Sequence, residues 1–380
     1  MKLRVVIALA FALVQVAGAQ SYRITDLGSL QPVAINAWGE IAGNLSNNHA
    51  FVRPIWGGVL DLGILPGGTF SQAAKINDLG EVTGTADGPA TMVDEGDSTK
   101  TASCASMTQP FIWTPGKGLT KAATIPIVAG LWRDATGQWQ EICNWGFYAQ
   151  ALNNKGQVVG SNNRQKDTYL NGFLWDGAQS FSLVVDDWQS NTNSINNSGV
   201  IAGRNIPGGY LSTAVRWKGG VATDLGGLNP GKECSDANSV NDLGQIVGWS
   251  ITEDSLCDEL SQTQAIVHAV LWEEGAGIQD LGTLPGDKFS TAQRISPSGI
   301  VIGNSGNTLV ADPVFSLAVQ VEGRPFIWSK SKGIQDLSGL IDHLGSWELN
   351  SVADINLWGQ IVGTGTKGGK AHGFLLTPDM

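Results

Sequence analysis

Residues 76–84 read Ile-Asn-Asp-Leu-Gly-Glu-Val-Thr-Gly, and the chain repeats this pattern throughout its length. The further copies begin at Ile35, Leu152, Ile195, Val240, Ile295 and Ile355. Each consists of an apolar residue, Asn, two variable residues, Gly, a mostly polar residue, Ile or Val, any residue and Gly. Because self-similarity of this kind is the signature of repeat architectures, the repeat decides the fold before any single residue does.

The Asn-x-x-Gly step of the repeat reverses the chain between two β-strands. Asn bonds to its own backbone and tolerates left-handed geometry, and Gly adopts positive φ without steric cost. Two β-type runs joined by such a short loop predict a hairpin. One copy has Ser296 in place of Asn, which makes a weaker version of the same turn. The closing glycine, such as Gly84, lies in a strand pattern and predicts a bulge or a close approach of two backbones.

Each repeat contains two more β-type segments, a Phe-Leu-Trp run as at 173–175 and an Asp-Leu-Gly run as at 61–63. Four-stranded units repeated about seven times predict an all-β fold, a seven-bladed β-propeller. The last repeat lacks its fourth strand, whereas residues 22–28 precede the first repeat. We therefore expect the N-terminal strand to join the last blade and close the ring. The alternative, an open solenoid, would need capping repeats at both ends.

The combined repeat resembles the HAF repeat of extracellular bacterial repeat proteins. Its parts are His-Ala-Phe, Asp-Leu-Gly-Thr-Leu-Pro-Gly-Gly, Ser-x-Ala and Ile-Asn-x-x-Gly-x-Val-x-Gly. They are clearest from Asp61 to Gly84 and from Asp280 to Gly303, and the third and fourth repeats depart most from them. The resemblance implies secretion and repetition, and it implies no particular reaction.

The first residues have the three parts of a secretory signal. Residues 1–4 are basic, residues 5–16 are apolar, and Ala17-Gly18-Ala19 supplies the small residues. This pattern predicts a signal peptide over 1–19, and its apolar run is too short to span a bilayer comfortably. We expect one propeller domain over 20–380, secreted to the periplasm or the medium, monomeric and not inserted in a membrane.

The composition excludes two classes of partner. The net charge is -11, which argues against nucleic acid, because nucleic-acid binding needs clustered Lys and Arg. The same charge argues against an anionic membrane surface. Charged residues make up 15% of the chain and 50 residues are Gly, as expected of a turn-rich all-β protein.

Four insertions lengthen the repeats, at 86–107, 122–147, 250–265 and 307–322. Inserted loops on one face of a repeat protein often bind its partners. The four cysteines are Cys104, Cys143, Cys234 and Cys257. An even number in an exported chain predicts disulfides, and of the three possible pairings we favour Cys104 with Cys143 and Cys234 with Cys257. Zinc is the competing interpretation, but no Cys-x-x-Cys spacing favours it, so we expect neither a metal nor a cofactor.

The tryptophans fall into groups. A recurring strand position predicts packing between blades for Trp113, Trp175, Trp217, Trp272 and Trp328, and Trp38 and Trp358 lie on the Asn-x-x-Gly turns. The candidate ligand-binding residues, in the second insertion, are Trp132, Trp139, Trp145, Arg133 and Glu141. Aromatic groups with polar neighbours are typical of sugar or peptide binders. The alternative is a small core beneath a long loop, and both interpretations stay open.

No residue pattern indicates a reaction. His49, His268 and His372 share one repeat position, and His343 beside Asp342 has no nucleophile with which to form a triad. We therefore expect a non-catalytic exported protein that binds a protein or glycan partner through its loop face. The alternative is a carbohydrate-active hydrolase or lyase with carboxylates at the channel mouth. The first is favoured because every recurring polar residue has a turn or strand explanation.

Overall fold

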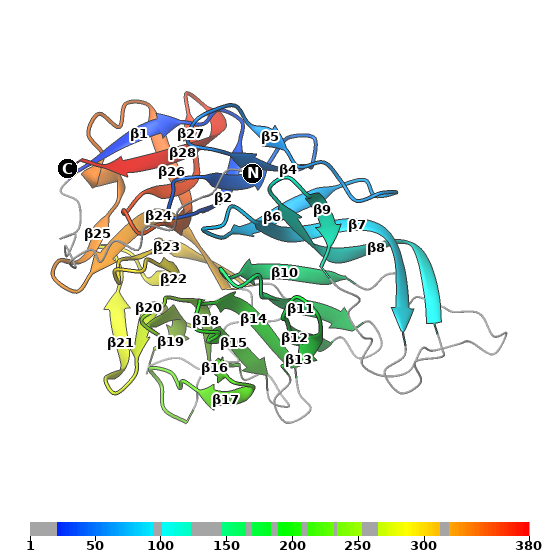
Figure 1. The fold of residues 1–380 in the computed structure, drawn as a ribbon. Coiled ribbons are helices and arrows are strands. Elements are labelled where there is room, and N and C mark those ends of the chain that lie inside the picture. Colours follow the sequence, from blue (N-terminus) through cyan, green and yellow to red (C-terminus); the bar gives the residue numbers. More distant parts are fainter. Residues whose placement is uncertain are drawn as a thin grey trace, which may run out of the picture.

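A computed structural model describes residues 21–93, 101–122, 146–164, 169–183, 189–206, 212–231, 234–252, 265–311 and 319–379. These residues form seven antiparallel four-stranded sheets, arranged as blades around a ring (Figure 1). The predicted seven-bladed β-propeller is therefore confirmed. Within the described ranges the one helical element is a 3-10 turn, η3 (Ser338–Leu340).

In blades 1 to 6 the four strands follow one another in the chain from the channel outward, whereas the outermost strand of blade 7 is the N-terminal β1. Blade 1 consists of β2 (Gln31–Ile35), β3 (Ile41–Asn44), β4 (Ala50–Arg53) and β5 (Leu60–Asp61). Blade 2 consists of β6 (Ser71–Ile76), β7 (Val82–Val93), β8 (Thr101–Thr114) and β9 (Gly118–Lys121). Blade 3 consists of β10 (Phe147–Leu152), β11 (Val158–Arg164), β12 (Tyr169–Trp175) and β13 (Ser180–Ser182). Blade 4 consists of β14 (Gln189–Ile195), β15 (Ile201–Ile206), β16 (Thr213–Lys218) and β17 (Val221–Asp224). Blade 5 consists of β18 (Ser235–Val240), β19 (Ile246–Ile251), β20 (Val267–Glu273) and β21 (Gly277–Gly282). Blade 6 consists of β22 (Phe289–Ile295), β23 (Val301–Ala311), β24 (Val319–Ser329) and β25 (Gly333–Asp336). Blade 7 consists of β26 (Trp347–Ile355), β27 (Ile361–Lys367), β28 (Lys370–Pro378) and β1 (Tyr22–Asp26).

The N-terminal strand closes the ring, as the sequence predicts. β1 pairs antiparallel with β28, so that Ile24 lies opposite Leu376. Ser21 Oγ donates a hydrogen bond of 2.8 Å to Asp379, and the Tyr22 side chain is buried in the last blade. On the inner side, β2 of blade 1 contacts β26 of blade 7. Both chain ends of the described part are thus held in one sheet, which leaves β28 with no open edge.

Each inner strand has a β-bulge at the same place, next to its last residues. In blade 2 the register shifts between Ala73 and Lys75. The closing glycine of the repeat lies opposite this bulge. A Cβ on Gly84 would lie 1.9 Å from the carbonyl oxygen of Gln72 and 2.8 Å from the Phe111 ring, so no other residue fits. The close backbone approach predicted for these glycines is therefore confirmed.

The hydrophobic core lies between neighbouring blades. One cluster joins Ala151 and Val159 of blade 3 to Trp217 of blade 4, and another joins Val247 of blade 5 to Trp328 of blade 6. Trp272 packs in the same way between blades 4 and 5. Trp113 and Trp175 are only partly buried but pack against such clusters too. The predicted role of this tryptophan position is confirmed.

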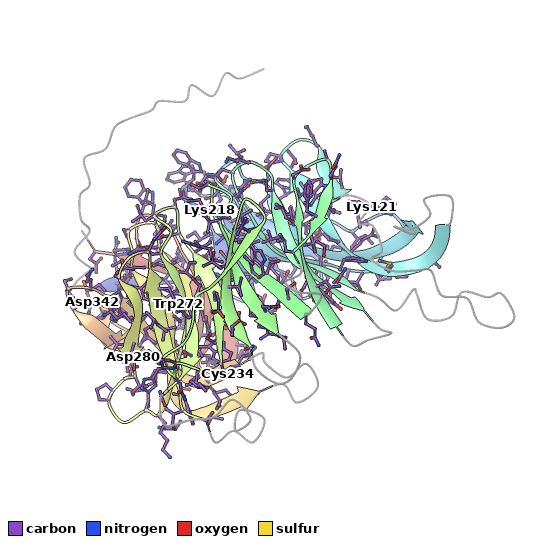
Figure 2. All side chains as sticks on the ribbon, turned by 90° about the horizontal axis from the view of Figure 1, so that it is seen from below. Lys121, Lys218, Cys234, Trp272, Asp280 and Asp342 are labelled. Atoms are coloured by element: carbon purple, nitrogen blue, oxygen red, sulfur yellow. The ribbon has the colours of Figure 1, made fainter. Side chains whose placement is uncertain are left out.

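The ring has two unlike faces because successive strands of a blade run in opposite directions. We call the face with the first-to-second and third-to-fourth connections the turn face, and the one with the second-to-third and blade-to-blade connections the loop face. Figure 2 shows Lys218, which precedes the β16–β17 turn, on the opposite side of the molecule from Cys234 at the start of blade 5. All four predicted insertions connect to strands at the loop face.

Two of the insertions differ from the loops expected. β7 and β8 continue their pairing to Val93 and Thr101, so most of 86–107 is a long hairpin. β23 and β24 likewise pair as far as Ala311 and Val319. Pairing satisfies the backbone donors and acceptors that a loop would have to leave to water, and it extends these two blades beyond the ring.

Candidate functional site

A series of hydrogen bonds joins the Asn-x-x-Gly turns around the central channel. Asn77 Oδ1 accepts the N–H groups of Leu79 and Glu81, and its Nδ2 donates to the carbonyl oxygen of Asn153 in the next blade. Six asparagines donate this bond from Nδ2 to a backbone carbonyl oxygen of the next blade, at 2.9 to 3.1 Å: Asn36, Asn77, Asn153, Asn196, Asn241 and Asn356.

Ser296 interrupts this series between blades 6 and 7. Its Oγ accepts the N–H of Ile300 at 3.0 Å, so it makes the turn within its own blade. A serine has no amide group with which to donate onward, and the described residues contain no bond from Ser296 to Asn356. The weaker turn predicted for this copy thus lacks its contact with the next blade.

The channel contains a cavity of about 290 Å³ at the level of these turns. Strand ends and turns from all seven blades line it. Its charged residues are Lys75, Arg294, Asp354, Asp78 and Asp242. This cavity is the place where side chains from the whole ring converge, and it is therefore the first candidate site.

Asp354 is the buried carboxylate of the cavity, and four blades meet at it. Lys75 Nζ of blade 2 lies 2.6 Å from its Oδ2, and the N–H of Ile35 in blade 1 donates to the same oxygen at 3.0 Å. Arg294 Nε of blade 6 lies 4.0 Å from Oδ1. These contacts link blade 7 to blade 6 where Ser296 provides no bond. Both carboxylate oxygens of Asp354 therefore have structural partners among the described residues.

Asp78 and Asp242 belong to a second, shorter series of bonds. Asp78 accepts the N–H of Ala37 at 2.9 Å and an Nδ2 hydrogen bond from Asn154. Asp242 accepts in the same way from the backbone and side chain of Asn197. Both carboxylates thus connect neighbouring turns, as do the asparagines beside them.

The recurring histidines form pairs at the loop face. His49 Nδ1 lies 3.0 Å from Asp61, His268 Nδ1 lies 2.8 Å from Asp280, and His372 Nδ1 lies 2.8 Å from Asp26. Each pair joins the third and fourth strands of one blade. The His of the His-Ala-Phe motif and the Asp of the Asp-Leu-Gly motif therefore form one contact. This structural contact accounts for both residues without a catalytic role.

Hydrogen bonds stabilise the charged form of these carboxylates. Burial raises the pKa of Asp280, but the His268 ring and the N–H of Gly282 outweigh burial and hold the pKa below its usual range. The Ser-x-Ala motif completes the contact, because Ser290 Oγ accepts the N–H of Ala269 and donates to the carbonyl oxygen of Gly282. Every polar part of the motif thus has a structural partner.

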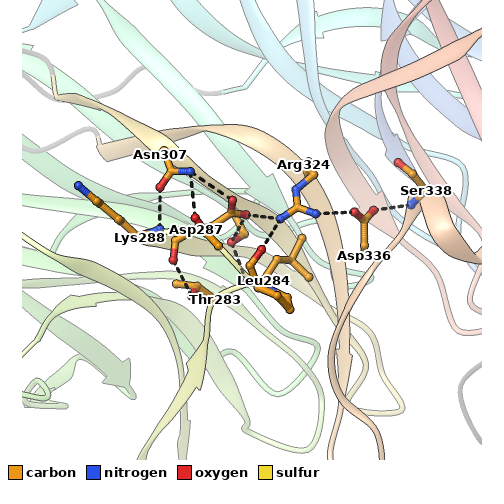
Figure 3. Close-up of polar contacts among 11 residues, drawn as sticks. Thr283, Leu284, Asp287, Lys288, Asn307, Arg324, Asp336 and Ser338 are labelled. Carbon is orange, nitrogen blue, oxygen red and sulfur yellow. Dashed lines mark hydrogen bonds and ion pairs between the residues drawn. The ribbon is translucent and has the colours of Figure 1, made fainter.

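In blade 6 an arginine takes the histidine position, as Figure 3 shows. Arg324 donates to Asp336 and to Asp287, each at 3.0 Å, and Asn307 Nδ2 donates to the carbonyl oxygen of Gly286 at 3.2 Å. The Asp287 carboxylate raises the pKa of Arg324. The guanidinium thereby joins the outer strands to the blade-to-blade connection, over a longer reach than a histidine has.

One ion pair is fully buried between blades 4 and 5. Arg204 Nη1 on β15 lies 3.2 Å from Asp236 on β18, and Asn193 Nδ2 donates to the same carboxylate at 2.9 Å. Burial raises the pKa of Asp236 in spite of the Arg204 charge. A pair enclosed in this way is a contact between blades, without access for a substrate.

The ligand-binding residues that the sequence predicts, Trp132, Arg133, Trp139, Glu141 and Trp145, lie outside the described residues, as do the signal peptide, Cys143 and Cys257. His343 is exposed beside Asp342, with its Nε2 3.8 Å from the carboxylate. Cys234 is buried and disulfide-bonded, and its favoured pairing with Cys257 stays a prediction.

The structure points to three tryptophans to which the sequence analysis assigns no binding role. Trp38 and Trp358, on the turns of blades 1 and 7, are 62% and 54% exposed beside the channel. Their placement on turns rather than in strands was the available signal, because a turn residue faces solvent. Trp56, in the β4–β5 connection of blade 1, is 88% exposed on the same face.

Two classes of feature are missing from the part of the chain that the structure describes. No three His, Cys, Asp or Glu side chains gather there in a way that could hold a metal ion. No helix in those ranges is long and apolar enough to cross a membrane.

Comparison with known proteins relates the chain to others by fold. No family model matches the sequence, and no curated protein matches it. An oligogalacturonate lyase solved in complex with manganese is similar in structure, with a TM-score of 0.52 and 11% identity, over 96% of this chain and 94% of that one. An oligogalacturonate lyase from Vibrio parahaemolyticus has a TM-score of 0.50 and 10% identity, over 94% of this chain and 97% of that one. At such low identities the likeness shows the propeller fold alone.

Proposed function

We propose that the protein is an exported, non-catalytic propeller that binds a protein or glycan partner through its loop face. One observation carries this proposal: every segment that exceeds the minimal repeat joins strands at that face, while the first-to-second turns on the opposite face stay short. Loops grouped on one face of a rigid repeat scaffold are where binding is most often found. Export follows from the predicted signal over residues 1–19, and the resemblance to HAF-repeat proteins agrees with it.

The described polar residues favour binding over catalysis. The carboxylates of the cavity bond to neighbouring blades, and the His-Asp pairs join strands within a blade. A glycan hydrolase or lyase needs carboxylates that converge on a substrate. Because the recurring carboxylates already have structural partners, the enzyme alternative has no described residue in its favour.

The test uses the exported protein, whose first residue we expect to be Gln20. Replacement of Trp132, Trp139 and Trp145 together by alanine should weaken binding to hits from a glycan array or a displayed peptide library by about tenfold or more, since aromatic residues dominate interfaces. The matched control is Leu243→Ala, which removes a 70% exposed side chain from the turn face. Unchanged affinity in a folded triple variant would exclude the second insertion as the binding surface.

A further inference from the structure

The turn face carries a group of exposed aromatic side chains that the loop-face proposal does not use. Of the tryptophans that the structure describes, Trp38, Trp56 and Trp358 are more than half exposed. All three belong to blades 1 and 7, and we call them the indole platform. Leu79 and Ile55, which are 55% and 49% exposed, lie on the same face of blades 2 and 1. Exposed aromatic groups of this kind mark binding sites more often than single apolar residues do.

Hydrogen bonds hold two of the platform rings in place. Trp358 Nε1 donates to the carbonyl oxygen of Ala37 at 2.7 Å, and Trp38 Nε1 donates to that of Asp78 at 2.8 Å. Each indole thus contacts the turn of the next blade. Asn356 Nδ2 also joins the turn of blade 7 to that of blade 1 by a bond to the carbonyl oxygen of Asn36. Because the polar N–H is already used, the flat face of the ring is what remains for a ligand. A ring that is fixed beforehand loses little entropy on binding.

Polar groups as well as apolar side chains surround the platform. Ala37 and Leu357 precede Trp38 and Trp358 in the sequence, and the carbonyl oxygen of Asp78 accepts the Trp38 indole N–H; all three residues line the channel cavity. Gln360 also lies beside the platform, since a Cβ on Gly39 would lie 3.2 Å from its Oε1 and 3.8 Å from Ile55 Cγ1. A dry protein interface over this area would bury amide and carboxylate groups at a cost. A ligand rich in hydroxyl groups would bond to them instead.

The carboxylates nearest the platform disfavour an anionic ligand, although Lys75 and Arg294 also line the channel cavity. The backbone carbonyl of Asp78 accepts the Trp38 indole N–H, and Glu40 Oε2 would lie 3.3 Å from a Cβ on Gly80 of the next turn. Both carboxylates belong to a chain with a net charge of -11. A polyanion would therefore be repelled, whereas a neutral chain would not.

We propose that the indole platform and the adjoining channel mouth form a binding site for a neutral oligosaccharide. The apolar faces of successive sugar rings stack on Trp358, Trp38 and Trp56, and the hydroxyl groups bond to the polar groups at the channel mouth. The site lies on the face opposite the inserted loops, so it goes beyond the function proposed above and does not depend on it.

The experiment measures binding of the mature protein to neutral hexasaccharides, namely cellohexaose, xylohexaose, mannohexaose and chitohexaose, with hexagalacturonate as the anionic counterpart. We expect the wild type to bind at least one neutral probe and not hexagalacturonate. Trp38→Ala with Trp358→Ala should weaken that binding by about tenfold or more, because both stacking surfaces are lost. The loop-face variant lacking Trp132, Trp139 and Trp145 should bind the neutral probe as the wild type does.

Two further variants separate stacking from folding. Trp38→Phe with Trp358→Phe removes both indole N–H groups but keeps the rings, and it should stay within about threefold of the wild type. Trp56→Ala removes a side chain with no hydrogen bond among the described residues, and it should weaken binding without altering the melting temperature. Three outcomes would each overturn the proposal. The folded wild type binds none of the neutral probes, it binds hexagalacturonate alone, or the Trp56→Ala variant binds the neutral probe with the affinity of the wild type.

Discussion

Asparagine recurs at one place in the repeat because no other side chain makes the same set of bonds there. Its Oδ1 accepts two N–H groups of its own turn, and its Nδ2 donates to the next blade, as Asn153 illustrates at 3.0 Å for each of these contacts. Aspartate has no N–H to donate, and serine has one oxygen on a shorter side chain. One residue therefore both shapes the local turn and joins two blades.

Asn153→Ala should lower the free energy of unfolding by about 2 to 3 kcal/mol, because it leaves buried backbone groups without partners. Urea denaturation, read as a change in midpoint at constant slope, measures this loss. The matched control is Ser296→Ala, which removes a turn bond but no bond to another blade, and its loss should be smaller. Equal losses in the two variants would mean that the bond between blades contributes nothing.

At the scale of the element, the closing strand is held by charge as well as by pairing. Asp26 on β1 accepts hydrogen bonds of 2.8 Å from Lys367 at the end of β27 and from His372 on β28. The Lys367 ammonium, then His372, hold the pKa of Asp26 well below its usual range. A carboxyl whose pKa is lowered in the folded state stabilises that state above the ordinary Asp pKa of about 3.9 and loses this contribution as the pH falls.

Asp26→Asn should therefore increase amide hydrogen exchange in β1 near pH 6 and reduce its further increase below about pH 4, where the wild type loses the contact. Hydrogen exchange at a series of pH values, corrected for the intrinsic rate, measures both effects. Asp61→Asn is the control, because the corresponding contact to His49 lies within blade 1 and should affect β5 rather than β1. An unchanged acid response of β1 in the Asp26 variant would count against this account.

At the scale of the whole molecule, the ring is a closed set of blade-to-blade clusters. The cluster between blades 6 and 7 includes Tyr22 from the start of the described chain beside Leu376 near its end. The adjacent cluster joins Leu27 to Phe51 of blade 1 and Val362 of blade 7. Because each blade packs on two neighbours, removal of one outer strand affects two interfaces and exposes an edge.

Deletion of residues 21–27 should lower the free energy of unfolding by about 4 kcal/mol, from the lost burial of Tyr22 and Leu27. It should also promote association through the unpaired edge of β28. Urea denaturation and sedimentation measure the two effects. The control, Arg23→Ala, removes a 72% exposed side chain and keeps the strand. A truncated chain with the association state and the stability of its parent would contradict the closed ring.

The sequence by itself determined the strand count, the hairpin turns, the glycines opposite the bulges and the strand that closes the ring. Each of these follows from local chemistry that the repeat restates, such as Asn77 with Gly80 or Gly84 against Gln72. Only the tertiary structure decided which residues meet across blades. Lys75 reaches Asp354 over 279 positions, and Trp358 reaches Ala37 over 321. Such contacts depend on the closure of the ring, which brings the first blade beside the last although their residues are hundreds of positions apart in the chain.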